Sequence, residues 1–153
     1  MPIDPVVVLA EELRNAEHTA RAARARNEDE HLTCLLARTV SLYNEISETV
    51  PTSALGAGEL VCLAAANIAS IDPRRSSQLQ ETAGRLKSGI RRQDDLIGLR
   101  KTAADFADSR FGEIGRSSAM LLHLAVRGAA RPVIVYRAVE WTRTDVEKEF
   151  GTI

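Results

Sequence analysis

Apolar side chains recur at helical spacing along most of the chain, and the clearest run lies between residues 72 and 110. One stripe repeats at steps of three, four and seven residues, which is the period of one helix face. It comprises Leu79, Ala83, Leu86, Ile90 and Ile97. A second, rotated stripe comprises Leu96, Leu99, Ala103 and Phe106. Asp72 and Pro73 are typical of a helix start, so the pattern predicts one long helix, or two helices joined near Gly98.

The front of the chain carries two apolar seams that are out of phase. The first comprises Leu9, Leu13, Ala16, Ala20 and Ala23, and the second comprises Leu32, Leu35, Thr39, Leu42 and Ile46. The phase slips by two residues between them, roughly 200° around a helix. Asn27 and Glu30 have the spacing of a capping box. We therefore expect a break near Asn27 and an antiparallel hairpin, with one continuous helix over 6–50 as the alternative.

Further helices are expected after Asp4-Pro5 and after Ser53, each of which offers a helix cap. Residues 119–130 are apolar on nearly every side, which predicts a buried helix capped by Ser117 or Ser118. The segment 132–150 combines β-branched residues with helical spacing, so it is read as a last helix, with a strand as the alternative. The whole chain, 1–153, is predicted to be a single all-α domain, a bundle of five to six helices.

The composition is poor in aromatic residues and rich in alanine, which indicates closely packed helices. Aromatic residues make up only 4% of the 153 residues, and alanine-rich helices pack closely or share surface with another subunit. No stretch approaches the ~20 apolar residues of a membrane span, and the N-terminus lacks the basic segment of a signal peptide. Cys34 and Cys62 lie within helical patterns and are expected to be buried, reduced thiols of a cytoplasmic protein.

Charge is distributed unevenly along the chain. Residues 1–73 hold eleven acidic residues against five arginines, whereas residues 74–101 hold eight basic residues against three acidic ones. The basic segment is read first as a solvated helix face with pairs such as Glu81–Arg85 and Arg91–Asp95. The alternative is a nucleic-acid-binding face. Its candidate residues are Arg91, Arg92, Arg100 and Lys101.

Two resemblances add expectations. The segment from His18 to Ala23 resembles the phosphorylated motif of histidine phosphotransfer domains, with Ala22 in the place of the family glycine. This resemblance implies that His18 carries a phosphoryl group and that Arg21 supplies the nearby cation. Asp4-Pro5 and the stretch 42–57, which includes Pro51-Thr52-Ser53, resemble small alanine-rich all-helical bacterial proteins of uncharacterised function. The second resemblance covers about the first 70 residues and implies a helical fold alone.

Other candidate chemistry is sparse. Glu28 and His31 have the Glu-x-x-His spacing of di-iron bundles, but the chain holds no second copy of that motif. The acidic residues 28–30 are therefore read as partners of a helix dipole, and His123 is read as a core histidine. Neither cysteine has a base beside it in sequence, and no phosphate-binding glycine loop is present. No metal, no cofactor and no enzymatic activity are expected.

The sequence thus favours a non-enzymatic protein-interaction or scaffold module. We expect a homodimer that packs at small residues, with the seam of Leu9, Leu13, Ala16 and Ala20 as its interface. A phosphotransfer module that uses His18 and a nucleic-acid-associated protein that uses the basic face are the two alternatives.

Overall fold

The computed structural model describes residues 3–140, with side chains up to residue 130. Within this range the chain forms six α-helices, one short 3-10 helix and no β-strand, so the predicted all-α fold is confirmed. The helices are α1 (Pro5–Ala25), α2 (Asp29–Ile46), α3 (Ala54–Ile68), α4 (Pro73–Lys87), α5 (Gln93–Phe106), η1 (Ser109–Phe111) and α6 (Gly112–Glu140). No helix in residues 3–140 has both the length and the apolar character needed to cross a membrane.

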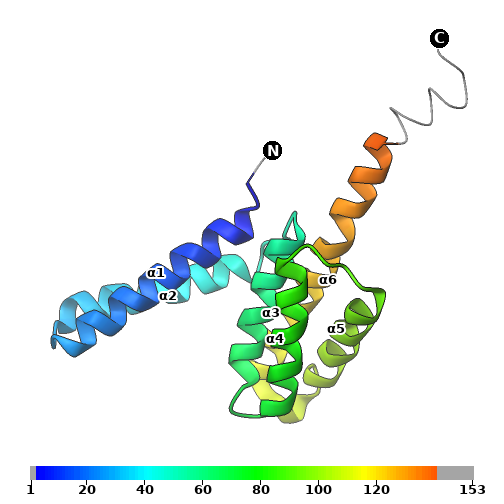
Figure 1. Cartoon of the computed structure of the whole chain (residues 1–153). Coiled ribbons are helices and arrows are strands. Elements are labelled where there is room, and N and C mark those ends of the chain that lie inside the picture. Colours follow the sequence, from blue (N-terminus) through cyan, green and yellow to red (C-terminus); the bar gives the residue numbers. More distant parts are fainter. Residues whose placement is uncertain (1–2, 141–153) are drawn as a thin grey trace, which may run out of the picture.

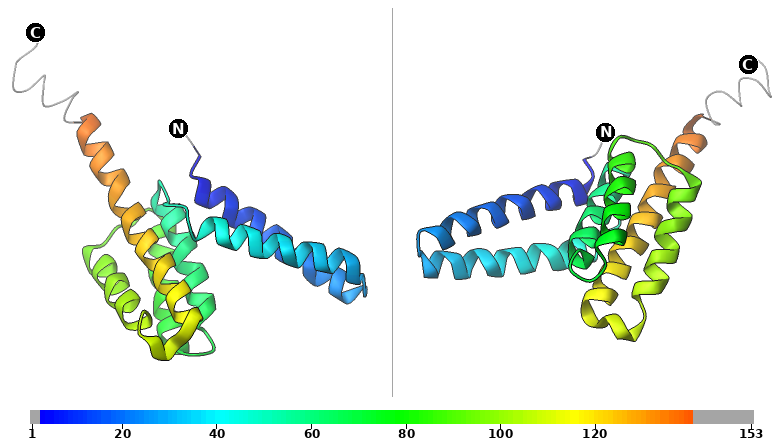
Figure 2. Two further views of the ribbon diagram at one scale, coloured as in Figure 1. Left: turned by 180° about the vertical axis from the view of Figure 1, so that it is seen from behind. Right: turned by 60° about the horizontal axis from the view of Figure 1, so that its bottom comes forward.

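Helices α3 to α6 form a bundle, and α1 and α2 form an antiparallel hairpin that projects from its side (Figure 1). In the bundle α3 packs against α4 and α6, while α5 packs against α6. The base of α1 packs against α3. The far end of the hairpin points away from the bundle in every view, and α5 lies on the opposite side of the bundle (Figure 1, Figure 2). One apolar core runs from Val6 to Ala129, so hairpin base and bundle share a single interior.

Three predicted helix starts are confirmed. The Asp4 carboxylate accepts from the Val6 N–H at 2.9 Å, and the Asp72 carboxylate accepts from the Arg75 N–H at 3.1 Å. The Ser53 hydroxyl accepts from the Gly56 N–H at 3.0 Å. Each side chain satisfies an N–H group that has no partner within its helix.

The predicted break near Asn27 is confirmed, and a continuous helix over residues 6–50 is excluded. The predicted capping box of Asn27 and Glu30 is not formed, because Asn27 ends α1 and does not begin α2. Its φ is 56°, and the Glu28 N–H reaches back to the Ala23 carbonyl at 3.0 Å. This is the Schellman ending of a helix, which needs a residue in the left-handed region.

The break between α4 and α5 falls at Gly89 and not near Gly98. Gly89 has a φ of 82°, and the Ile90 N–H donates to the Arg85 carbonyl at 2.8 Å, the same Schellman ending as in the hairpin. Gly98 lies within α5. Because the chain turns at Gly89, Ile90 and Ile97 leave the predicted core stripe and are exposed.

Helix α6 also begins earlier than predicted. It begins at Gly112, so Ser118 lies within the helix, fully buried, and does not cap it. Gly115 is needed there because a Cβ atom would collide with the Phe106 carbonyl and lie 2.5 Å from the Phe111 Cβ. The backbone stays helical past Pro132 to Glu140, which excludes a strand over 132–140. The rest of the predicted last helix, 141–150, lies outside the described residues.

The predicted burial of residues 119–130 is confirmed at most positions, but one face of the helix is exposed. Met120 is 51% exposed, and His123 and Arg127 are also exposed. These positions follow one another at helical steps of three and four residues, so α6 has one outward face. His123 is therefore a surface residue and not the predicted core histidine.

Candidate interaction surfaces

The hairpin is joined to the bundle by a buried carboxylate. Asp4 is 6% exposed, and its oxygen atoms accept from the Thr52 N–H at 3.0 Å and from the Ser53 hydroxyl at 2.5 Å, in addition to the Val6 N–H. Ser53 caps α3, so one carboxylate supports the starts of α1 and α3 together. Gly56 makes this possible, because a Cβ atom there would occupy the place of the carboxylate.

A second polar junction lies further along α1. Glu59 of α3 is 7% exposed and binds Arg14 of α1 at 2.6 Å and Lys87 of α4 at 3.6 Å. A buried carboxylate without a partner would cost several kcal/mol, so these two cations stabilise its charge. This three-residue cluster fixes the hairpin relative to α3 and α4.

The third junction is formed by Tyr43 of α2. Its hydroxyl lies 2.7 Å from the Ser117 hydroxyl of α6 and accepts from the Asn67 side-chain amide of α3 at 2.6 Å. The two hairpin helices are thus each tied to the bundle by side chains, which sets the direction in which the hairpin projects.

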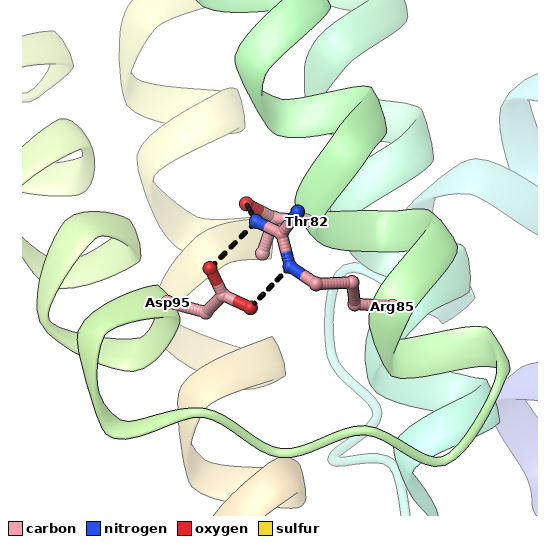
Figure 3. Close-up of polar contacts among 3 residues, drawn as sticks. All are labelled: Thr82, Arg85 and Asp95. Carbon is pink, nitrogen blue, oxygen red and sulfur yellow. Dashed lines mark hydrogen bonds and ion pairs between the residues drawn. The ribbon is translucent and has the colours of Figure 1, made fainter.

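Helices α4 and α5 are joined mainly by ion pairs. Arg85 donates to Asp95 through two nitrogen atoms, each at 2.7 Å, and lies 3.4 Å from the Thr82 hydroxyl (Figure 3). Arg75 pairs with Asp105 at 2.7 Å towards the other end of both helices. The predicted pairs Glu81–Arg85 and Arg91–Asp95 are wrong, because Arg85 and Asp95 bind each other between helices.

The pairing of Arg85 with Asp95 shifts the pKa of both side chains. The hydrogen bond from Arg85, together with the charges of Arg85 and Arg92, holds the pKa of Asp95 below its ordinary value of 3.8 even though burial opposes this. The hydrogen bond to Asp95 raises the pKa of Arg85. A lowered carboxyl pKa stabilises the fold above the unfolded pKa, and this contribution is lost as the pH falls through the folded pKa.

Replacing Asp95 by asparagine should lower the free energy of unfolding by about 1–3 kcal/mol at pH 7, because Arg85 loses a charged acceptor that is only 10% exposed. The difference from the native protein should shrink below about pH 4, where the unfolded carboxyl binds a proton. Urea denaturation at pH 7 and pH 3 measures both values. The matched control is Asp105→Asn, whose side chain is 39% exposed, with an expected loss of about 0–1 kcal/mol. Equal losses in the two variants would contradict the claim that the Arg85–Asp95 pair stabilises the fold more than the Arg75–Asp105 pair.

The two phosphotransfer candidates lie on the hairpin. His18 is exposed in the middle of α1, and Arg21 is exposed one turn further along the same helix. The exposure agrees with what transfer of a phosphoryl group to imidazole requires. The hypothesis stays a prediction, since exposure alone identifies no chemistry.

The four residues of the predicted basic face all reach solvent. Arg91 and Arg92 lie in the loop between α4 and α5, and Arg100 and Lys101 lie on α5. None of the four forms an ion pair with another residue of the described part of the chain. Arg100 and Lys101 lie on α5 and Arg91 and Arg92 directly precede it, so all four belong to the element that lies opposite the hairpin (Figure 1).

The predicted dimer seam packs within the chain. Leu13 and Ala20 are buried in the hairpin, and Leu9 and Ala16 are partly buried against the same core. These side chains cover α2 and the neighbouring part of α3, so a second copy cannot use them without opening the hairpin. The choice of this seam as an interface is wrong.

Exposed apolar residues on α2 were missed by the sequence reasoning. Leu36 is 43% exposed and Val40 is 60% exposed, and the two are one helical turn apart. The sequence did indicate their exposure, because Leu36 and Val40 both fall outside the apolar seam that ends at Leu42 and Ile46. Cys34 was misjudged as well, since its thiol is exposed on α2, whereas Cys62 is partly buried.

The acidic turn at the tip of the hairpin contains the Glu-x-x-His spacing that was compared with metal sites. Glu28, Asp29, Glu30 and His31 line an open hollow there. Among the described residues no group of three or more His, Cys, Asp or Glu side chains is placed to hold a metal ion. Asp29 and Glu30 lie in the first turn of α2, as expected for residues that complement the helix dipole.

Comparisons with protein-family models, with curated proteins and with solved structures found no match to this chain.

Proposed function

We propose that the chain is a non-enzymatic protein-interaction module whose hairpin presents one face of α2 to a partner. The observation that carries this proposal is the pair Leu36 and Val40, exposed by 43% and 60% on a hairpin that projects from the bundle. Neighbouring apolar side chains that remain in contact with water are typical of surfaces that a partner covers.

The polar junctions at the base of the hairpin support this proposal. Asp4, Glu59 and Tyr43 hold the hairpin in one orientation through hydrogen bonds and ion pairs. A surface that is fixed before binding loses less conformational freedom when the partner docks. The hairpin is thus a rigid support for the face of α2.

The experiment compares the double variant Leu36→Glu/Val40→Glu with the native chain. Each is immobilised and exposed to an extract of the organism that encodes it, and any retained protein is then purified and mixed with the chain at known concentrations. We expect the double variant to weaken the reconstituted complex at least about tenfold, because two buried carboxylates would lack partners.

The matched control is Ala37→Glu/Ser41→Glu, which adds the same charge at exposed positions further around α2. The control variant should bind like the native chain. A complex that the control weakens as much as the apolar double variant does would rule out a specific role for Leu36 and Val40. Retention of no protein at all would rule out the function itself.

A further inference from the structure

Helix α6 has an outward face that its packing against α3 and α5 leaves uncovered. The exposed residues of this face follow one another at steps of three and four, and they are Arg116, Met120, His123 and Arg127. Among the described residues, neither Arg116 nor Arg127 has an ion-pair partner. Helix α6 therefore adds two unpaired cations to the four found on α5 and directly before it.

Helices α5 and α6 lie side by side and run in opposite directions (Figure 2). They touch where a Cβ atom on Gly115 would meet the Phe106 carbonyl. Both helices rise by about 1.5 Å per residue, so residues at equal steps from this contact lie level with each other. Arg100 and Lys101 are thus level with Met120, in the middle of the outward face of α6.

The remaining cations lie at one end of the same two helices. Arg127 comes twelve residues after Gly115, which makes it level with the first turn of α5. Arg91 and Arg92 directly precede that turn and are exposed. The basic residues of both helices form one surface, the α5–α6 face, which comprises Arg91, Arg92, Arg100, Lys101, Arg116 and Arg127.

Arg100 lies on the side of α5 that faces away from α4. Asp95 and Asp105 bind arginines of α4, so they mark the side of α5 that faces α4. Arg100 is five residues from each of them, and five residues turn a helix by one full turn and about 140°. The two acids are thus turned away from Arg100 and already paired, and they do not neutralise it.

The α5–α6 face has a surplus of positive charge. Between residues 91 and 127 seven basic residues are exposed, whereas only three acidic residues are exposed, namely Asp94, Asp108 and Glu113. The surplus extends to the whole bundle side of the chain, since residues 74–130 hold eleven basic residues against six acidic ones. Residues 1–73 are acidic, and their hairpin lies opposite α5 (Figure 1). A polyanion would therefore attract the α5–α6 face and repel the hairpin side, which orients the chain before contact.

The chemistry of this face suits phosphate groups. Five of its six cations are arginines, whose planar guanidinium groups can donate two hydrogen bonds to one phosphate. Among the described side chains no aromatic residue is exposed, so unpaired bases would find nothing to stack on. The large apolar residues on this side, Ile97 and Met120, are too few to enter a lipid bilayer. These properties favour the backbone of a duplex over a single strand or a membrane.

We propose that the α5–α6 face binds the phosphate backbone of duplex nucleic acid, independently of base sequence. This inference goes beyond the proposed function and does not rest on it, since Leu36 and Val40 lie on the hairpin. From Arg116 to Arg127 the face is roughly 16 Å long, about half a turn of B-form duplex. Each cation that reaches a phosphate releases a counterion, so binding weakens steeply as the salt concentration rises.

The salt dependence of binding tests the proposal. Fluorescence anisotropy of a labelled duplex of about two helical turns measures the Kd at several salt concentrations. We expect a Kd in the micromolar range at about 50 mM salt, and a slope of log K against log salt of about −4 to −5, the value for about five phosphate contacts. A second duplex of unrelated sequence should bind equally well.

Variants of each helix show whether both contribute. Arg100→Gln/Lys101→Gln on α5 and Arg116→Gln/Arg127→Gln on α6 should each make the slope shallower by about 1–2, because each removes up to two phosphate contacts. The matched control is Arg24→Gln/Arg26→Gln, which removes the same charge at the exposed tip of the hairpin and should leave the slope unchanged. Circular dichroism of each variant shows that the helices remain.

Several outcomes would overturn the inference. They are a native chain that does not bind the duplex at low salt, a control variant that loses as much binding as the two helix variants, and tighter binding to a single strand than to the duplex. Vesicles of phosphatidylserine and phosphatidylcholine are the last probe. If they retain the native chain more tightly than the duplex does, the α5–α6 face belongs to a membrane surface and not to nucleic acid.

Discussion

Replacing Asp4 by alanine should lower the free energy of unfolding by about 3–4 kcal/mol, because three donors lose their charged acceptor together. A helix cap alone contributes about 0.5–2 kcal/mol. Here the same carboxylate also receives the Thr52 N–H and orients the Ser53 hydroxyl that caps α3. Urea denaturation followed by circular dichroism measures the loss.

Asp72→Ala is the matched control for Asp4→Ala. Asp72 also precedes a proline at a helix start, but its carboxylate accepts from the Arg75 N–H alone. Its removal should lower the free energy of unfolding by about 1 kcal/mol. Asp4→Asn should lie between the two, because asparagine caps a helix well but lacks the charge that draws the other donors. Equal losses for both alanine variants would mean that Asp4 caps α1 and does not join the hairpin to the bundle.

The contacts of Asp4 show which features of the fold can be predicted from the sequence and which cannot. Asp4-Pro5, Ser53 and Asp72-Pro73 act on neighbouring N–H groups, so their spacing alone predicted three helix starts. The contact from Asp4 to Thr52 spans 48 residues, and no local pattern encodes it. The pairs Arg14–Glu59 and Arg85–Asp95 were missed for the same reason.

Glycines were the other source of error. Gly89 and Gly98 look alike in sequence, but only Gly89 has a left-handed φ, and it therefore ends α4. Gly115 has a different role again, since it lies inside α6 where another backbone comes close. A glycine marks a turn or a close crossing, and tertiary contacts decide between these two roles.

For the candidate surfaces, too, local features were predicted from the sequence and long-range arrangement was not. Exposure of Arg91, Arg92, Arg100 and Lys101 was predicted from local charge, and all four are exposed. The position of this face relative to α2 depends on how the hairpin leaves the bundle, which the pattern of apolar residues does not record. The predicted seam on α1 failed because one helix face packs equally well within a chain or between two chains.

Replacing Gly128 by alanine should lower the free energy of unfolding by about 2–3 kcal/mol, since the added methyl group has no space. Helix α6 crosses the chain before α3 at this point. A Cβ atom on Gly128 would lie 2.6 Å from the Pro51 carbonyl oxygen and 2.8 Å from the Pro51 Cδ. Pro51 is fully buried, and its ring and carbonyl are stiffer than a long side chain, so the two segments must move apart.

The same substitution at Gly84 should have the opposite sign. Gly84 lies within α4, and a Cβ atom there would meet no other atom within 4 Å. Alanine is favoured over glycine inside a helix by about 0.5–1 kcal/mol, because the unfolded chain loses less freedom. Thermal and urea denaturation of both variants under one buffer give the two signs. A Gly128→Ala variant as stable as Gly84→Ala would show that α6 does not pass this close to Pro51, and would remove the crossing that positions α6 beside α3.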